Sequence, residues 1–218
     1  MTRPRVLVTR RWPQAVETKM AEVFDLTLNT SDRPLTEPEL KDALGQYDAV
    51  LPTVTDRLPA TVFDRASTRT RILANYGVGF AHIDTEAAKA RGIAVTNTPD
   101  VLSECTADIA MTLLLMVARR AGEGERELRE GRWTGWRPTH LIGTKVSGAT
   151  LGIIGFGRIG QAMAQRAHFG FGMKILVQNR SPVPAEVLAR YNATQVPSIE
   201  DLLPDCDFVS LHCPGGAE

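Results

Sequence analysis

A strand that runs directly into a glycine-rich turn and then a helix is the feature that most limits how this chain can fold. The apolar run 150–154 precedes three glycines spaced G-x-G-x-x-G, and an amphipathic stretch follows. The first glycine permits a tight turn, the second lets the backbone approach a pyrophosphate, and the third allows close helix–strand packing. The helix N-terminus then offers unpaired N–H groups to the anion. We therefore expect a dinucleotide to bind at this turn, which consists of Gly155, Phe156, Gly157, Arg158, Ile159 and Gly160.

The end of the next expected strand indicates which dinucleotide is bound. Asn179 lies 19 residues after Gly160, and an NAD-specific site has a carboxylate about 20 residues on that binds the ribose. Here an amide is followed by Arg180 and Ser181, so no charge repels a 2′-phosphate and Arg180 can pair with it. This favours NADP(H), with NAD(H) as the alternative. The plainer interpretation of Arg180 is a solvated side chain at a strand end.

Short β-rich runs alternate with helical segments over the first hundred residues, which predicts an α/β unit with a parallel sheet and helices on both faces. A capping box at Thr36 and Glu39 marks the start of one helix. The strands are expected at 5–9, 48–54, 71–75 and 93–97, more weakly at 25–28, and the helices at 14–24, 36–44, 59–66 and 85–91. The second half has expected strands at 150–154, 174–178 and 207–212, with a short edge strand at 193–196.

The region between these two halves begins with a long apolar helix, expected at 103–120, and continues as a polar segment from 121 to 145. Apolar residues crowd more than one face of this helix, so we expect it to be buried on several sides. Trp133 and Trp136 lie in what we expect to be an irregular arm. The arm is either a surface loop whose indoles fold back on their own domain or a protein interface, in which tryptophan is enriched.

Composition excludes several classes of partner. The chain has 25 basic and 25 acidic residues and is 43% apolar, which is ordinary for a globular protein. Its net charge of zero provides no excess positive charge to attract nucleic acid or an anionic membrane. The longest apolar stretch, 109–118, is too short to span a bilayer. Three cysteines without CxxC spacing suggest neither disulfides nor a metal site. With no signal-peptide pattern at the N-terminus, we expect a cytoplasmic protein.

The chain resembles the D-isomer-specific 2-hydroxyacid dehydrogenase family, and within it the glyoxylate/hydroxypyruvate reductases. The resemblance is carried by NYGVGFAHID (75–84), GIAVTNTPD (92–100), CTADIA (105–110), GFGRIG (155–160) and LHCP (211–214), in the order and spacing of the family. It implies a flavodoxin-like substrate domain over 1–99. It also implies the first part of a Rossmann-type doubly wound dinucleotide-binding domain over 100–218, incomplete at the C-terminus and carrying a dimerisation helix and arm.

The resemblance also implies roles for individual residues. The backbone N–H groups of Val78 and Gly79 would hold the substrate carboxylate, and Val54 would line the substrate side. Thr106 would contact the cofactor near its phosphates, while Arg158 and Ile159 would offer N–H groups to the pyrophosphate. The adenosine would be flanked by Cys213 and Pro214. The plainer interpretation of Cys213, and of Cys105 and Cys206, is a buried small apolar side chain.

No catalytic residue is expected within this chain. The family's arginine, glutamate and histidine come later than Glu218, and His82, His140, His168 and His212 are better explained as structural or surface residues. The implied reaction passes a hydride from NAD(P)H to a small 2-oxo acid such as glyoxylate or hydroxypyruvate, giving glycolate or D-glycerate. The resemblance further implies a homodimer formed through residues 103–145. The alternatives are a non-catalytic dinucleotide-sensing module of the co-repressor type, or a relative acting on formate, phosphite or phosphoglycerate.

Overall fold

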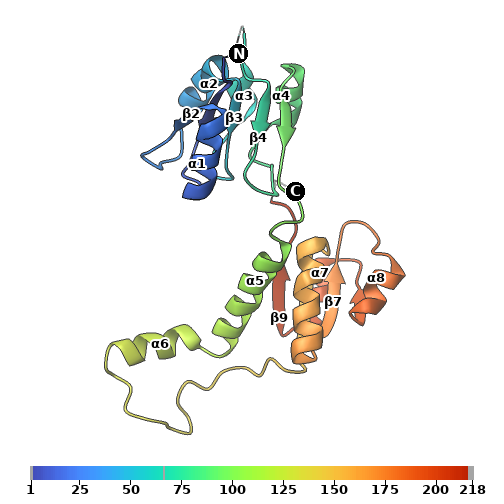
Figure 1. The fold of residues 1–218 in the computed structure, drawn as a ribbon. Coiled ribbons are helices and arrows are strands. Elements are labelled where there is room, and N and C mark those ends of the chain that lie inside the picture. Colours follow the sequence, from blue (N-terminus) through green and yellow to red (C-terminus); the bar gives the residue numbers. More distant parts are fainter. Residues whose placement is uncertain (1, 66, 216–218) are drawn as a thin grey trace. The chain divides into compact units, whose positions relative to one another are not determined.

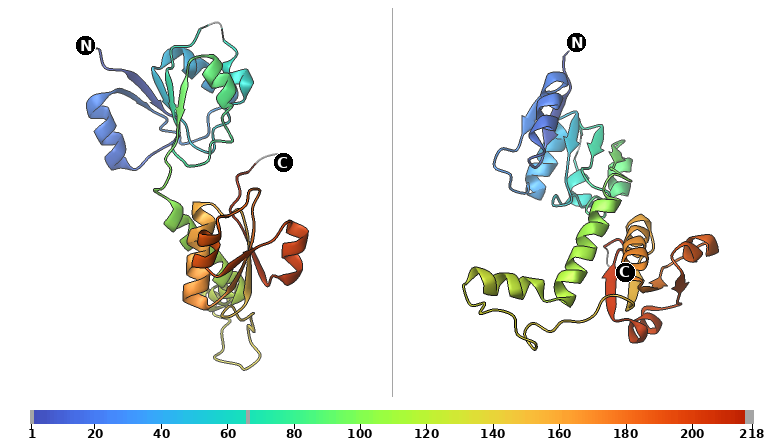
Figure 2. Two further views of the ribbon diagram at one scale, coloured as in Figure 1. Left: turned by 90° about the vertical axis from the view of Figure 1, so that its right-hand side faces the viewer. Right: turned by 60° about the horizontal axis from the view of Figure 1, so that its bottom comes forward.

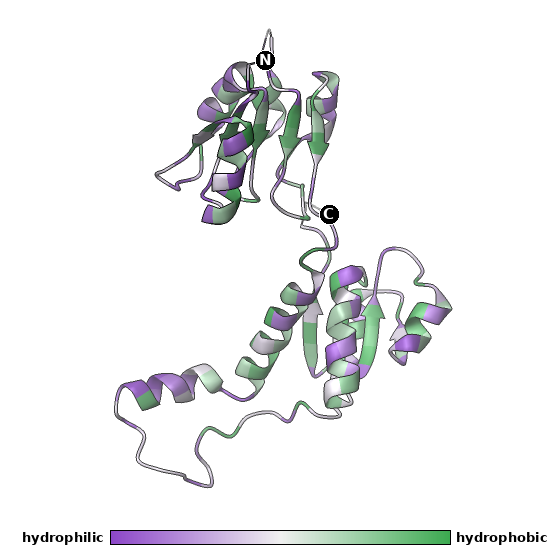
Figure 3. Ribbon diagram, in the orientation of Figure 1, coloured by the Kyte–Doolittle hydropathy of each residue, from purple (hydrophilic) through white to green (hydrophobic). Residues whose placement is uncertain are grey.

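The computed structural model describes residues 2–65 and 67–215, which form two compact units (Figure 1). Residues up to Asp100 belong to the first unit and Val101–Pro214 form the second. Glu218, to which we expected the second domain to extend, lies outside the described residues. The central strands of both units are coloured mainly as hydrophobic in Figure 3, as expected for parallel strands that are covered on both faces. No helix among the described residues is long and apolar enough to cross a membrane.

The first unit contains one five-stranded parallel sheet. Its strands are β1 (Arg5–Val8), β2 (Asp25–Leu28), β3 (Ala49–Leu51), β4 (Ile72–Ala74) and β5 (Ala94–Thr96). Their order is β2-β1-β3-β4-β5, with every pair parallel. This is the flavodoxin-like order. Strand β2 is added on one side of β1 and the later strands on the other, so the strand order reverses between β1 and β3. The strand that the sequence predicted most weakly, β2, is confirmed and forms one edge of the sheet.

Helices cover both faces of this sheet (Figure 2). They are α1 (Gln14–Val23), α2 (Glu37–Gln46), α3 (Ala60–Phe63) and α4 (Thr85–Ala90). Successive residues of β1 point to opposite faces, so Leu7 joins the core cluster of α2, α3 and α4, whereas Val6 and Val8 join the cluster with Trp12 and Met20. The predicted capping box of α2 is present in full.

Two expected elements of the first unit are much shorter than predicted. Strand β3 ends at Leu51 rather than at 54, since Pro52 follows and lacks the N–H that a strand needs. Helix α3 is a single turn over Ala60–Phe63 rather than a helix over 59–66, and the expected last residue, 66, lies outside the described residues.

The second unit contains a four-stranded parallel sheet made of β6 (Thr150–Ile154), β7 (Lys174–Gln178), β8 (Ala193–Gln195) and β9 (Phe208–Leu211). The order β8-β7-β6-β9 matches the first four strands of the Rossmann order 3-2-1-4-5-6. The connections are α7 (Arg158–Gln165), which continues into a π-helical turn over Arg166–Gly170, α8 (Ala185–Arg190), and α9 (Ile199–Leu202) with a 3₁₀ turn over Leu203–Asp205. Among the described residues β9 is an edge strand, with Leu211 exposed.

Helix α5 (Ser103–Ala118) packs against α7, and Ala107 and Met111 join the core with Ile153. The expectation that α5 is buried on several sides is wrong for the single chain. Its second apolar face is open, because Ile109, Leu113, Met116 and Val117 are all exposed. The sequence thus correctly indicated apolar residues on more than one face of α5, but within this chain one of these faces is not covered.

The polar segment after α5 contains a helix that was not expected, α6 (Ala121–Arg129). Gly122 and Gly124 weaken its helical pattern, while ion pairs of Arg120 with Glu123 and of Arg129 with Glu125 support it. The arm that follows has no regular structure, as predicted. Trp136 is 84% exposed and Trp133 53%, so the indoles do not fold back on their own unit.

Candidate functional site

The glycine turn of the second unit adopts a conformation that excludes side chains at two of its three glycines. Gly155 has a φ of +90°, and a Cβ there would lie 2.5 Å from the backbone nitrogen of Cys213. A Cβ on Gly160 would lie 2.3 Å from the carbonyl oxygen of Gly155. At Gly157, by contrast, a Cβ would have nothing within 4 Å and would face open space at the start of α7. The turn therefore leaves room for a ligand against its second glycine.

The turn also presents hydrogen-bond donors. The backbone N–H groups of Gly157 and Ile159 have no acceptor among the residues that the structure describes, as is usual at a helix N-terminus. The N–H of Phe156 is used differently, because it donates to Oδ1 of Asn179 at 3.1 Å. A pyrophosphate could accept hydrogen bonds from the N–H groups of Gly157 and Ile159, because its negative charge suits a helix N-terminus and there is room beside Gly157.

Asn179 connects the glycine turn to the end of β7. While its Oδ1 accepts from Phe156, its Nδ2 donates to the carbonyl oxygen of Ser181 at 3.0 Å. Gln195, at the end of β8, donates to the same carbonyl and accepts from the N–H of Val183. The amide pair thus shapes the segment on which Arg180 and Ser181 are exposed. Gln195 was not predicted from the sequence, although its position at the carboxyl end of β8 is the kind of place where ligand-binding residues gather.

The remaining predicted cofactor residues follow β9 or lie in α5. Cys213 and Pro214 are exposed, and the backbone of Cys213 adjoins Gly155. The interpretation of Cys213 and Cys105 as buried apolar side chains is wrong, since both residues are exposed. Thr106 lies in the first turn of α5, with its N–H bonded to the carbonyl of Leu102 at 2.9 Å.

In the first unit the loop after β4 carries Val78 and Gly79, two of the three residues predicted to contact substrate. Asn75 is buried, and its Nδ2 donates to the carbonyl oxygens of Gly77 (3.2 Å) and Gly79 (2.9 Å). The N–H groups of Val78 and Gly79 have no acceptor in the described part of the chain. Val54 adjoins this loop, since its Cγ1 lies 3.0 Å from where a Cβ on Gly77 would stand, and it is exposed.

A buried carboxylate holds the neighbouring loop after β3. Asp56 is fully buried, and its Oδ2 accepts from Oγ1 of Thr9 at 2.5 Å and from the N–H of Thr53 at 2.8 Å. These residues follow β1 and β3, so polar side chains gather at the carboxyl edge of the sheet. Their placement directly after apolar strands of a parallel sheet is the sequence signal that points to this edge.

The four histidines all have partners within their own unit. Nε2 of His82 lies 3.0 Å from Oδ1 of Asn75, and Nε2 of His140 lies 2.8 Å from Oε2 of Glu127. Nδ1 of His168 contacts the carbonyl of Met173, and Nε2 of His212 contacts the hydroxyl of Ser210. Burial lowers the pKa of His212 and of His82, although the charge of Asp56 partly offsets the effect on His82.

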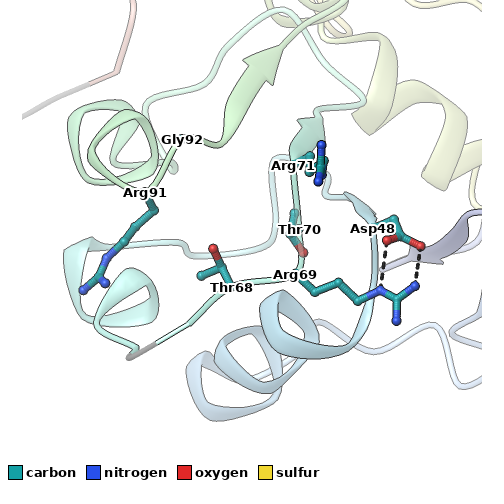
Figure 4. A pocket seen from close by; sticks show the side chains of 7 residues that line it. All are labelled: Asp48, Thr68, Arg69, Thr70, Arg71, Arg91 and Gly92. Atoms are coloured by element: carbon teal, nitrogen blue, oxygen red, sulfur yellow. Dashed lines mark hydrogen bonds and ion pairs between the residues drawn. The ribbon is translucent and has the colours of Figure 1, made fainter.

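A cavity of about 550 Å³ opens at the amino ends of β3, β4 and β5, the opposite edge of the sheet from the loop of Asn75 (Figure 4). Arg69 forms a two-point ion pair with Asp48 there, at 2.9 and 3.0 Å. None of the residues predicted to bind substrate or cofactor lines this cavity, whose walls are Asp48, Thr68, Arg69, Thr70, Arg71, Arg91 and Gly92.

Comparison with known proteins identifies the class. Residues 111–218 match the family model of the D-isomer specific 2-hydroxyacid dehydrogenase, NAD binding domain. The chain belongs to this family, as the sequence motifs predicted, and its second unit carries the dinucleotide-binding turn of that domain.

Individual relatives narrow the comparison. Glyoxylate reductase of Thermococcus kodakarensis is 43% identical over 216 residues, which is 97% of this chain and 64% of the relative. Glycerate dehydrogenase of Hyphomicrobium methylovorum is 39% identical over 218 residues, covering 100% and 67%. A solved putative D-isomer specific 2-hydroxyacid dehydrogenase from Polaromonas has a TM-score of 0.87 at 36% identity, covering 98% of this chain and 66% of that one. The chain thus spans about two thirds of the length of these relatives.

Proposed function

We propose that this chain forms the substrate-binding unit and part of the nucleotide-binding unit of an enzyme that reduces glyoxylate or hydroxypyruvate to glycolate or D-glycerate. The observation that carries the proposal is the identity of about 40% to proteins named glyoxylate reductase and glycerate dehydrogenase over nearly the whole chain. The loop that offers the N–H groups of Val78 and Gly79 beside Val54 supports a small substrate with a carboxylate.

The residues of the second unit would hold the cofactor. The N–H groups of Gly157 and Ile159 would bind the pyrophosphate. The backbone N–H of Arg158, at the start of the same helix, would also face it. When bound, a reduced nicotinamide supplies a hydride to the ketone carbon of the substrate. In the first unit, Val78 and Gly79 would fix the substrate carboxylate, while Val54 would limit the size of the group on the other side of the ketone.

We propose NADP(H) as the preferred cofactor. Support comes from the segment that follows β7, where Asn179 is neutral and engaged with Phe156, and Arg180 and Ser181 are exposed. A neutral amide does not repel a 2′-phosphate, and an arginine attracts it. Thr106, Cys213 and Pro214 would complete the cofactor contacts.

We place the proton donor outside residues 1–218. The family's arginine, glutamate and histidine are expected after Glu218, and each histidine described here already has a partner. The test follows the nicotinamide absorbance with NADPH and either glyoxylate or hydroxypyruvate. It compares the 218-residue chain with an extended protein, in which this chain is followed by the part of glyoxylate reductase of Thermococcus kodakarensis that lies beyond the region of similarity. The extended protein should turn over and the 218-residue chain should not. Robust turnover by the shorter chain would contradict this assignment, and His212→Ala would then be the first variant to test.

We also propose a cytoplasmic homodimer that associates through residues 103–145. Exposed apolar side chains occur along α5, α6 and the arm, namely Ile109, Leu113, Met116, Val117, Leu128, Trp133, Trp136 and Ile142. An apolar surface of this kind is typical of an obligate interface. Replacing Trp133 and Trp136 together with Ser should lower the mass measured by light scattering towards that of a monomer. An unchanged mass would limit the arm to a surface loop.

A further inference from the structure

The loop 75–79 owes its shape to two side-chain amides that hold three consecutive carbonyl groups. Nδ2 of Asn75 donates to the carbonyls of Gly77 and Gly79, and Nδ2 of Asn97 donates to the carbonyl of Val78 at 2.9 Å. Because a trans peptide is planar, its C=O and the following N–H point in opposite directions. Holding the carbonyl of Gly77 inward therefore turns the N–H of Val78 outward, and holding that of Val78 does the same for Gly79.

The orientation of the Asn75 amide is fixed by what surrounds it. Its amino group must face the two carbonyl oxygens, since its own oxygen would be repelled by both. Oδ1 of Asn75 consequently faces Nε2 of His82 at 3.0 Å. An oxygen in this position needs a donor, so the ring of His82 must carry its proton on Nε2. Burial lowers the pKa of His82 and favours the neutral ring, which leaves one proton for this bond.

We propose that His82 is a positioning residue of the substrate-carboxylate site, acting through Asn75 to keep the N–H of Val78 directed at the carboxylate. The inference rests on the proposed function, because it assigns a role within the same site. It differs from an acid–base role, since the Nε2 proton of His82 is directed at an amide oxygen that does not take up a proton. His82 should therefore affect how tightly a carboxylate binds and leave binding of the dinucleotide unchanged.

Two substitutions at His82 distinguish the effect of losing the hydrogen bond from the effect of losing the imidazole ring. His82→Gln places an amide nitrogen near the position of Nε2 and retains the donor, whereas His82→Leu removes it. His168→Leu is the matched control, because that histidine also bonds a partner on its own unit but lies in the second unit.

The first measurement needs no ligand. The ¹⁵N shifts of the His82 ring in the 218-residue chain should show Nε2 protonated and Nδ1 unprotonated. The opposite tautomer would overturn the proposal even if His82→Leu failed to fold.

The second measurement uses the extended protein of the turnover test, with and without each substitution. It is titration with oxamate, an unreactive analogue of a 2-oxo acid, in the presence of NADPH, followed through the amide signals of Val78 and Gly79. His82→Leu should weaken oxamate binding roughly tenfold, the effect of about one hydrogen bond, with His82→Gln and His168→Leu within about twofold of the unsubstituted chain. Equal binding by His82→Leu and the unsubstituted chain would overturn the role of His82 and leave the proposed function standing. No oxamate response at Val78 and Gly79 in the unsubstituted chain would overturn both.

Discussion

The carboxyl ends of the two sheets both present backbone N–H groups without acceptors in the described part of the chain, but they are built by opposite means. In the second unit the glycines are responsible, since Gly155 and Gly160 permit an approach of backbone atoms that no side chain would allow. In the first unit hydrogen bonds are responsible, with Asn75 and Asn97 each holding carbonyls of one loop. A steric requirement leaves a spacing pattern in the sequence, whereas a hydrogen-bond network depends on residues that the fold brings together.

This difference predicts how each end responds to substitution. A site that depends on missing side chains should fail abruptly when a methyl group is added. A site that depends on several hydrogen bonds should weaken by degrees as each is removed.

The largest effect is expected at Gly155. Gly155→Ala places a methyl group 2.5 Å from the backbone nitrogen of Cys213, at a φ of +90°, so the free energy of unfolding should fall by about 3 kcal/mol. Chemical denaturation of the variant measures this loss. The matched control is Gly157→Ala, where the methyl group meets open space; its stability should stay within about 0.5 kcal/mol, while its affinity for dinucleotide falls. Equal destabilisation by the two variants would show that the turn is not sterically limited.

The next largest effect is expected at Arg180, and it tests whether the second unit also uses a positive charge to bind the dinucleotide. Arg180→Ala should weaken NADPH binding by about 1.5–3 kcal/mol, the range of a charge-assisted hydrogen bond, and leave NADH nearly unchanged. Calorimetric titration with each dinucleotide measures the difference. Arg190, an exposed arginine in α8, provides the control Arg190→Ala. Equal losses for NADPH and NADH would refute the preference for NADP(H).

A smaller effect is expected at the buried carboxylate of the first unit. Asp56→Ala removes the acceptor from the N–H of Thr53 and the hydroxyl of Thr9, so the free energy of unfolding should fall by about 2 kcal/mol. Asp56→Asn keeps an acceptor oxygen and should lose less. If both variants were equally unstable, the charge of Asp56 would matter more than its hydrogen bonds.

The smallest effect is a pH dependence shared by both units. Burial lowers the pKa of His82 and of His212 below the ordinary 6.5, so the unfolded chain binds more protons than the folded one in the range just below that value. The free energy of unfolding should therefore fall as the pH drops through 6.5. His82→Gln should remove part of this slope and His212→Gln another part. A flat profile between neutral pH and the carboxylate range would contradict the burial of both rings.

The same contrast explains what sequence analysis could predict. The glycine turn and the strands that flank it were predicted from the sequence pattern, because each glycine meets a local steric need. The bonds joining His82, Asn75 and Asn97 could not be predicted, since they depend on how the loops after β4 and β5 meet. Helix α6 was missed because Gly122 and Gly124 obscure its pattern. For α5, apolar content indicated burial on several sides but carried no information on what covers the face that is open in this chain.

Cys213 is an exposed residue, which makes the wall of the glycine turn a target for chemical labelling. Its backbone nitrogen adjoins Gly155, so a bulky adduct on this side chain would stand beside the turn. Cys206 should react much more slowly, because burial and the carboxylates of Asp205 and Asp207 raise the pKa of its thiol and keep it protonated. An alkylating reagent should therefore mark Cys105 and Cys213 first, and a bound dinucleotide should slow the labelling of Cys213, which would make this cysteine an optical or mass reporter of occupancy at the turn.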